Sequence, residues 1–228
     1  FSYLPMYGIQ LAFKDYRVAD GIWGSAWVGL KHFKTFFESY QFTNLVWNTL
    51  ALSLYSLIAE FPLPILFALF LNYISSKKLK KFSQMVTYAP HFISTVVFCG
   101  MILIFLASDG IINQILMILG IDPVNFLSNP ANFRHIYVWS GVLKGIGWGS
   151  IMYISVLTSV GPELHEAATV DGATRFQRML FIDIPSIIPT MVIMLIMRTG
   201  EIMDVGFEKV FLLQNNINLD YSEIISTY

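Results

Sequence analysis

Ionisable side chains within long apolar stretches are the residues of this sequence that could do chemistry. Glu60 interrupts the first long stretch, and Arg198, Glu201 and Asp204 follow one another at intervals of three in the last. A charge at the centre of a membrane helix costs about 2.5 to 3.5 kcal/mol on insertion scales, so each group needs a partner or water. Such groups could relay a proton or a cation, or line a polar path for a hydroxylated solute.

The spacing of the last three charges predicts one polar face. Residues three apart lie on the same side of a helix, so Arg198 can neutralise Glu201 or Asp204. Two interpretations stay open, namely ion pairing toward the interior of a helix bundle and lining of a translocation path. Glu60 lies beside Pro62 and Pro64, where a broken helix could open a polar niche for a substrate or a gate. Trp148 is a candidate for stacking against a sugar. The alternative interpretation is that it belongs to the belt of aromatic residues at the membrane interface.

The sequence contains none of the usual catalytic motifs. It has no Gly-x-Ser-x-Gly elbow, and it has no Gly-x-x-x-x-Gly-Lys-Ser/Thr loop that could cradle a nucleotide. The four histidines lack metal-ligand spacing, and the single cysteine, Cys99, allows no intrachain disulfide. We therefore expect a chain that is not an enzyme and binds neither metal nor cofactor, so any ATP and Mg²⁺ would belong to a partner.

The composition indicates that the lipid bilayer is the solvent. Hydrophobic residues make up 55% of the 228 residues and charged residues 13%, about half the charged share of a soluble domain. The mean hydropathy is +0.61. The net charge of −1 offers no basic excess to attract phosphates, so nucleic acid is not an expected partner.

Four runs are long enough to cross about 30 Å of hydrocarbon, which needs about 20 mostly apolar residues. They cover residues 44–74, 84–107, 135–160 and 187–207, and residues 1–13 are expected to be the tail of a fifth span. The predicted fold class is all-α, a polytopic transmembrane helical bundle that lacks residues at both ends. Residues 1–43 would hold the first helix tail and an extracytoplasmic segment, and residues 44–228 the membrane domain. The compact run Lys77-Lys78-Leu79-Lys80-Lys81 favours a cytoplasmic position for segments 75–83 and 158–186.

The loop of residues 161–189 carries a pattern of two short helices about a glycine. Pro162 suits a first helical position, and Glu163 and Glu166 favour the positive end of a helix. Gly172 can adopt the left-handed conformation that ends a helix. A second helical segment then runs to Pro185. The small side chains of Ala167 and Ala168 leave the backbone open to a partner protein.

This loop resembles the EAA loop of ABC importer permeases, the binding-protein-dependent inner-membrane subunits. The matching elements are Glu166-Ala167-Ala168, Asp171-Gly172-Ala173, Ile184-Pro185 and Pro189, at the family's spacing. The resemblance implies a type I permease fold and a coupling helix from Glu163 to Gly172 that is seated in a groove of an ATPase subunit. It assigns coupling to Glu163, Glu166, Ala167, Ala168, Asp171, Gly172, Pro185 and Pro189.

The opening segment narrows the resemblance to permeases for oligosaccharide and polysaccharide uptake. The segments Tyr3-Leu4-Pro5-Met6-Tyr7-Gly8 and Trp27-Val28-Gly29-Leu30 are similar to that branch. It implies a multi-pass protein of a prokaryotic cytoplasmic membrane. Its partners would be ABC ATPase subunits, a second permease in a heterodimer, an extracytoplasmic solute-binding protein and membrane lipid.

Two alternatives stay open. An ion-coupled secondary transporter would use Glu60, Glu201 and Asp204 as its proton or sodium relay. An ABC permease for peptides, amino acids or phosphonates would share the coupling loop but carry another cargo.

Overall fold

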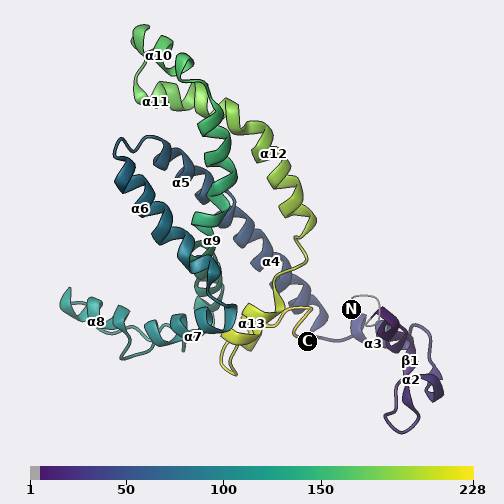
Figure 1. The fold of residues 1–228 in the computed structure, drawn as a ribbon. Coiled ribbons are helices and arrows are strands. Elements are labelled where there is room, and N and C mark those ends of the chain that lie inside the picture. The colour runs from purple at the N-terminus through teal and green to yellow at the C-terminus, as the bar shows by residue number, and fades with distance from the viewer. Residues whose placement is uncertain (1–5) are drawn as a thin grey trace. The chain divides into compact units, whose positions relative to one another are not determined.

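The computed structural model describes residues 6–228, and most of these residues are in helices (Figure 1). The expectation of an all-α membrane protein is confirmed. The chain forms two compact units, one ending at Trp47 and one covering Asn48–Tyr228. Each unit is described by itself.

The first unit holds short elements. They are the 3-10 helix η1 (Tyr7–Phe13), strand β1 (Lys14–Asp15), α2 (Gly21–Gly24), β2 (Ala26–Trp27) and α3 (Lys31–Phe37). Residues 1–5 of the expected helix tail lie outside the described residues. Within the described residues, Tyr7–Phe13 form the 3-10 helix η1, and the expectation of a helix tail stays a prediction. The helix η1 ends because Lys14 is extended and pairs with Trp27 in the antiparallel strand pair.

The second unit begins within α4 (Phe42–Glu60) and contains the remaining helices. In chain order these are α5 (Pro62–Asn72), α6 (Lys77–Tyr88), η2 (Ala89–Phe92), α7 (Thr95–Phe105), α8 (Ile111–Ile118), α9 (Asn132–Ser159), α10 (Pro162–Val170), α11 (Arg175–Arg178), the π-helical turn η3 (Met179–Asp183), α12 (Ile184–Gly200), α13 (Phe207–Leu213) and α14 (Leu219–Ser222). α10 and α11 lie at one end of this unit, and α7, α8 and α13 lie toward the other (Figure 1).

Two stretches of the described chain are helical, long and apolar enough to cross a membrane. The first is residues 42–72, close to the predicted 44–74. The second is Arg175–Gly200, and it corrects the predicted 187–207 at both ends. It starts early because Thr174 and Gln177 form a reciprocal capping box, and it continues past Pro185 because the π-helical turn precedes that proline.

The predicted spans 84–107 and 135–160 differ from their expectation. The first is split into two helical pieces, Lys77–Phe92 and Thr95–Phe105, that meet at an angle of 106°. The break is local, because Pro90 lies in a 3-10 turn and Ser94 caps a new helix by accepting from the Val97 N–H. α9 has the length of a span with 28 residues, but its composition is less apolar than that of the two spans above.

α9 is the central helix of the second unit, which explains its composition. It contacts α5, α6, α12, α13 and α14. A helix covered by protein does not need an apolar side chain on every face. Its glycines instead allow close approach, since a Cβ at Gly147 would overlap the Thr87 carbonyl and one at Gly149 would lie 3.2 Å from Pro64.

We expect Gly147→Ala to destabilise this bundle by about 1 to 3 kcal/mol, because the added methyl group meets backbone that cannot move aside. Gly145→Ala is the matched control on the same helix, since nothing lies within 4 Å of a Cβ at that position. Thermal unfolding in detergent checks the difference. Equal melting temperatures for the two variants would contradict this account of the packing.

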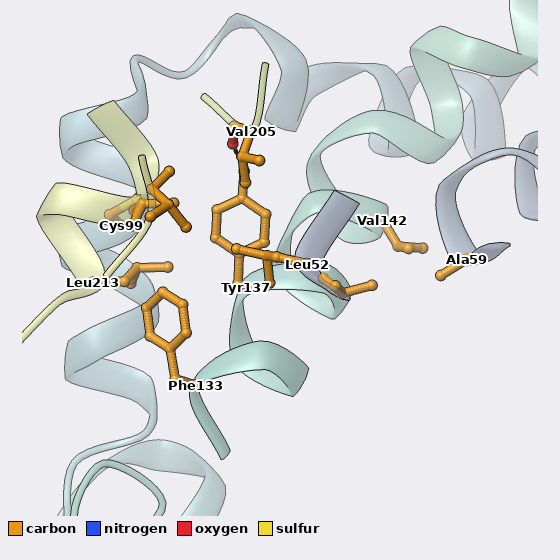
Figure 2. Close-up of a cluster of buried hydrophobic side chains, with 11 residues drawn as sticks. Leu52, Ala59, Cys99, Phe133, Tyr137, Val142, Val205 and Leu213 are labelled. Atoms are coloured by element: carbon orange, nitrogen blue, oxygen red, sulfur yellow. Dashed lines mark hydrogen bonds between the residues drawn. The ribbon is translucent and has the colours of Figure 1, made fainter. Parts of the chain in front are cut away.

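A cluster of buried side chains joins α9 to α4, α7 and α13. Figure 2 shows Phe133, Tyr137 and Val142 of α9 beside Leu52 of α4 and Leu213 of α13. The Tyr137 hydroxyl donates a hydrogen bond to the carbonyl of Val205. This bond fixes the turn and irregular segment between α12 and α13 against α9, next to the cavity that Tyr137 also lines.

Candidate coupling segment and polar cavity

The segment from Gly161 to Arg178 folds as the sequence predicts, with two helices about a glycine. Gly161 precedes α10, Pro162 occupies its first turn, and Glu163 adds a negative charge there. Gly172 has φ +80°, a left-handed conformation that favours glycine, and it follows the end of α10. The Ala173 N–H then donates to the Ala168 carbonyl over 2.9 Å, which closes the helix end.

The outer face of this segment is open. Glu163, Glu166, Ala167 and Asp171 are exposed, and Ala168 is half-buried. The apolar side chains of Leu164 and Val170 are 58% and 87% exposed. An apolar and acidic helix face with small residues between is accessible to a partner protein.

Pro185 and Pro189 lie elsewhere than expected. Both are part of α12, Pro185 in its first turn and Pro189 in its interior. The predicted second helix therefore does not end at Pro185. The two prolines shape the continuous helix that leaves the coupling segment, since each removes one backbone donor.

Beneath the segment lies a buried contact that the sequence analysis did not single out. Asp183 is fully buried. One carboxylate oxygen, Oδ2, accepts a hydrogen bond of 2.6 Å from the Tyr73 hydroxyl, and Oδ1 lies 3.3 Å from Nε2 of His165. Burial, and next the hydrogen bond to Asp183, raise the pKa of Tyr73, so its hydroxyl stays protonated and donates. The signal in the sequence was a lone acid among Phe181, Ile182 and Ile184.

The candidate path residues meet in a polar cavity of about 310 Å³ at the other end of α12. Glu60, Arg198, Glu201 and Asp204 line it together with Tyr137 and the hydroxyl-bearing Ser53 and Ser56. Nη1 of Arg198 lies 3.5 Å from Oε2 of Glu60. A second cavity of about 160 Å³ shares Glu60, Arg198 and Glu201 with the first.

The prediction that Arg198, Glu201 and Asp204 share one face of a helix is wrong, because the helix ends before Glu201. α12 ends at Gly200, Glu201 caps it, and Asp204 lies in the following turn, where Oδ1 accepts from the Gly206 N–H over 3.2 Å. The three charges nevertheless line one cavity, because the chain turns back toward α9. Glu60, which is far away in the sequence, supplies the ion-pair partner of Arg198 that Glu201 and Asp204 were expected to supply.

Two further positions differ from the sequence analysis. Trp148 does not line this cavity, since its ring stacks on His91 with centroids 4.3 Å apart. Lys209 was not singled out, yet its ammonium donates to the Tyr137 carbonyl over 2.6 Å. Its place in Phe207-Glu208-Lys209-Val210 gives no periodic signal that would have indicated burial.

The model of one protein family, the binding-protein-dependent transport system inner membrane component, matches residues 60–208. The match covers the coupling segment, the continuous helix and all four charged residues that line the cavity. The chain belongs to this family. The resemblance found in the EAA-like loop is thereby confirmed, and the family is that of the permease subunits of ABC importers, which reside in the inner membrane.

Relatives of this permease match it over its whole length. It is 42% identical to the polygalacturonan/rhamnogalacturonan transport system permease protein YteP of Bacillus subtilis, covering 100% of this chain and 71% of that one. It is 40% identical to protein LplB of the same organism, covering 100% and 72%.

A solved structure is also similar. The permease matches a chain of a bacterial ABC transporter involved in the import of the acidic polysaccharide alginate, with 42% identity and a TM-score of 0.89. The match covers 100% of this permease and 77% of that chain. The same kind of transporter has been solved in complex with an alginate pentasaccharide-bound periplasmic protein, with a TM-score of 0.88 for the matching chain. The fold of the ABC importer permeases is therefore that of this chain.

Proposed function

We propose that this permease imports a carbohydrate, with energy that reaches it through α10 from a separate ATPase subunit. One observation carries the proposal. An uninterrupted helix, Arg175–Gly200, connects the coupling segment at one end to Arg198 and the polar cavity at the other. Its 26 residues correspond to about 40 Å at 1.5 Å per residue, which is enough to cross the hydrocarbon layer.

A continuous helix transmits displacement. When two ATPase subunits close on ATP, they would shift α10, and the rigid segment that follows it would shift the cavity wall around Arg198. The cavity would then open alternately to each side of the membrane. Glu166 and the exposed alanines of α10 would contact the ATPase groove, and Gly172 would provide the turn.

The chemistry of the cavity suits a sugar. Carboxylate oxygens of Glu60, Glu201 and Asp204 accept hydrogen bonds from hydroxyl groups, and the Arg198 guanidinium can donate to them. The hydroxyls of Ser53 and Ser56 are buried and without a partner among the described residues. The named relatives support a saccharide cargo, since YteP is by name a polygalacturonan/rhamnogalacturonan transport system permease and the solved neighbour is involved in the import of alginate.

The partners follow from the same proposal. They are two ABC ATPase subunits that hold ATP and Mg²⁺, a second permease in a heterodimer, and an extracytoplasmic solute-binding protein that delivers the sugar. This chain would serve as the transport subunit without catalysis of its own, and the surrounding lipid would be its remaining partner. Segments 75–83 and 158–186 are both expected in the cytoplasm, and Tyr73, two residues before the first segment, donates a hydrogen bond to Asp183 in the second.

An ion-coupled secondary transporter is the second candidate, because three carboxylates line one membrane cavity. It would move solute in vesicles on an ion gradient alone, without any ATPase. The ABC permease requires ATP in trans and shows no intrinsic ion dependence. This difference separates the two functions directly.

A cysteine crosslinking scan tests the proposal. Cys99 is the only cysteine, so a Cys99→Ser background allows single cysteines at positions 163–172 in the complex with a candidate ATPase. We expect crosslinks with helical periodicity on the exposed face of α10, and their loss when Gly172→Pro is added. Absence of any ATPase association, together with gradient-driven uptake, would establish the ion-coupled alternative.

A further inference from the structure

We propose that Asp183 is a positioning residue that fastens the coupling helix α10 to two membrane helices at once. It holds α10, the start of α12 and the end of α5 together as one body. The inference rests on the proposed function, because it concerns how displacement of α10 reaches the bundle.

The contact joins three separate segments of the chain. Asp183 ends the π-helical turn before α12, His165 belongs to α10, and Tyr73 follows α5. Each carboxylate oxygen faces one of the two partners, at 2.6 Å for Tyr73 and 3.3 Å for His165. Tyr73 and Asp183 are 110 residues apart in the chain, so the pair is formed by tertiary structure alone.

Polar contacts must carry the attachment of α10, because none of its nine residues is buried. A cavity of about 410 Å³ lies between α10 and the bundle, lined by Tyr73, His165, Thr169 and Arg178 among others. Arg178 provides a second tie, since Nη1 donates to the Thr169 hydroxyl over 2.8 Å. That tie connects α10 to the neighbouring helix α11, whereas Asp183 also accepts from Tyr73 at the end of α5.

A buried carboxylate is a costly way to gain stability. Removing a carboxylate from water costs several kcal/mol, and well-packed apolar side chains of similar volume are often as stable or more stable. What the carboxylate adds is direction, because Oδ2 accepts from Tyr73 while Oδ1, which has no hydrogen-bond partner among the described residues, faces His165 at 3.3 Å. The π-helical turn brings Asp183 to this place, and such turns are frequent at functional sites.

The coupling between ATP hydrolysis and cavity opening tests the inference without knowledge of the sugar. In the full complex with its binding protein, on the Cys99→Ser background, Ile202→Cys reports access to the cavity through its rate of reaction with a membrane-impermeant methanethiosulfonate. The measured quantity is the change in this rate between the nucleotide-free and the vanadate-trapped complex. ATP hydrolysis and the melting temperature are measured on the same samples.

We expect Tyr73→Phe and His165→Leu each to reduce the ATP-dependent change by about fivefold or more, while hydrolysis and complex assembly persist. His165→Gln retains an N–H donor of similar reach, so it should restore most of the change. The double variant should be no worse than the poorer single one, because both act through Asp183. Tyr88→Phe is the matched control, since that hydroxyl pairs with Ser150 and Gln84 and does not contact α10.

An unchanged rate difference in both Tyr73→Phe and His165→Leu would overturn the inference. An equal loss in Tyr88→Phe would also overturn it, because the effect would then be general. Asp183→Asn is the variant of Asp183 itself that is least expected to unfold the protein, because it keeps the shape of the side chain and an acceptor for Tyr73. It removes the charge, so we expect it to reduce the ATP-dependent rate change as His165→Leu does. If Gly172→Pro also leaves the rate difference unchanged, the proposed function fails, and not this inference alone.

Discussion

Replacement of Gly172 by valine is expected to abolish coupled transport while the permease still inserts and assembles. Gly172 has φ +80°, and nothing lies within 4 Å of a Cβ there, so the effect is conformational and not steric. A left-handed backbone costs an L-residue about 1 to 2 kcal/mol, and more for a β-branched one. The turn would adopt another conformation, and α10 would change its orientation toward the ATPase in the assembled complex. Sugar uptake by the reconstituted complex should fall about tenfold or more.

Gly120→Val is the matched control for this experiment. Gly120 has φ +76° and equally open surroundings, but it follows α8 and lies outside the coupling segment. Both variants carry the same local penalty, so only position distinguishes them. Equal uptake by the two variants would show that the turn at Gly172 has no special part in coupling.

Replacement of Arg198 by methionine should have the second large effect, on transport and stability together. Arg198 is the only cationic side chain among the described residues that line the cavity, which also holds three carboxylates. Its removal leaves Glu60 without the partner at 3.5 Å, and Lys209 remains as the cation whose charge acts on that carboxylate. The Arg198 side chain is 53% exposed, so we expect a loss of about 1 to 2 kcal/mol, below the 3 to 5 kcal/mol of a fully buried pair. Thermal unfolding and uptake assays measure both effects.

The second-site variant Glu60→Gln separates charge from packing in this prediction. It removes the carboxylate that Arg198 neutralises, so it should recover most of the melting temperature of Arg198→Met. Arg198→Lys keeps the positive charge and should lie near the unmodified protein in stability. No recovery by Glu60→Gln would show that Arg198 acts through its volume and not through the ion pair.

Several features of the permease could be predicted from sequence because they depend on local chemistry. Proline at position 162, an acidic first turn and Gly172 predict the ends of α10 through backbone geometry. The coupling loop has a fixed spacing of small and acidic residues, so its family was identifiable. The first span was predicted within a few residues. Pro62 and Pro64 lie in the first turn of α5, and the break at Phe61 is small, so α4 and α5 together form one span.

Other features depended on helix caps and turns that a hydropathy pattern does not reveal. Hydropathy alone could not show that Arg175–Gly200 is one helix, because Pro185 suggests a helix end. The capping box at Thr174 starts the helix early, and the π-helical turn lets it continue through Pro185. It also could not show that the helix of residues 77–92 meets α7 at 106°, since Ser94 starts a new helix in an apolar context.

The sequence by itself determined the solvent, the family and the coupling turn, because composition, motif spacing and backbone preference are properties of neighbouring residues. Only the tertiary structure decided which charges are partners. Arg198 pairs with Glu60, and Asp183 accepts a hydrogen bond from Tyr73, although the members of each pair are far apart in the chain. The packing of α9 against α5 and α12 decides which groups lie within reach of each charge.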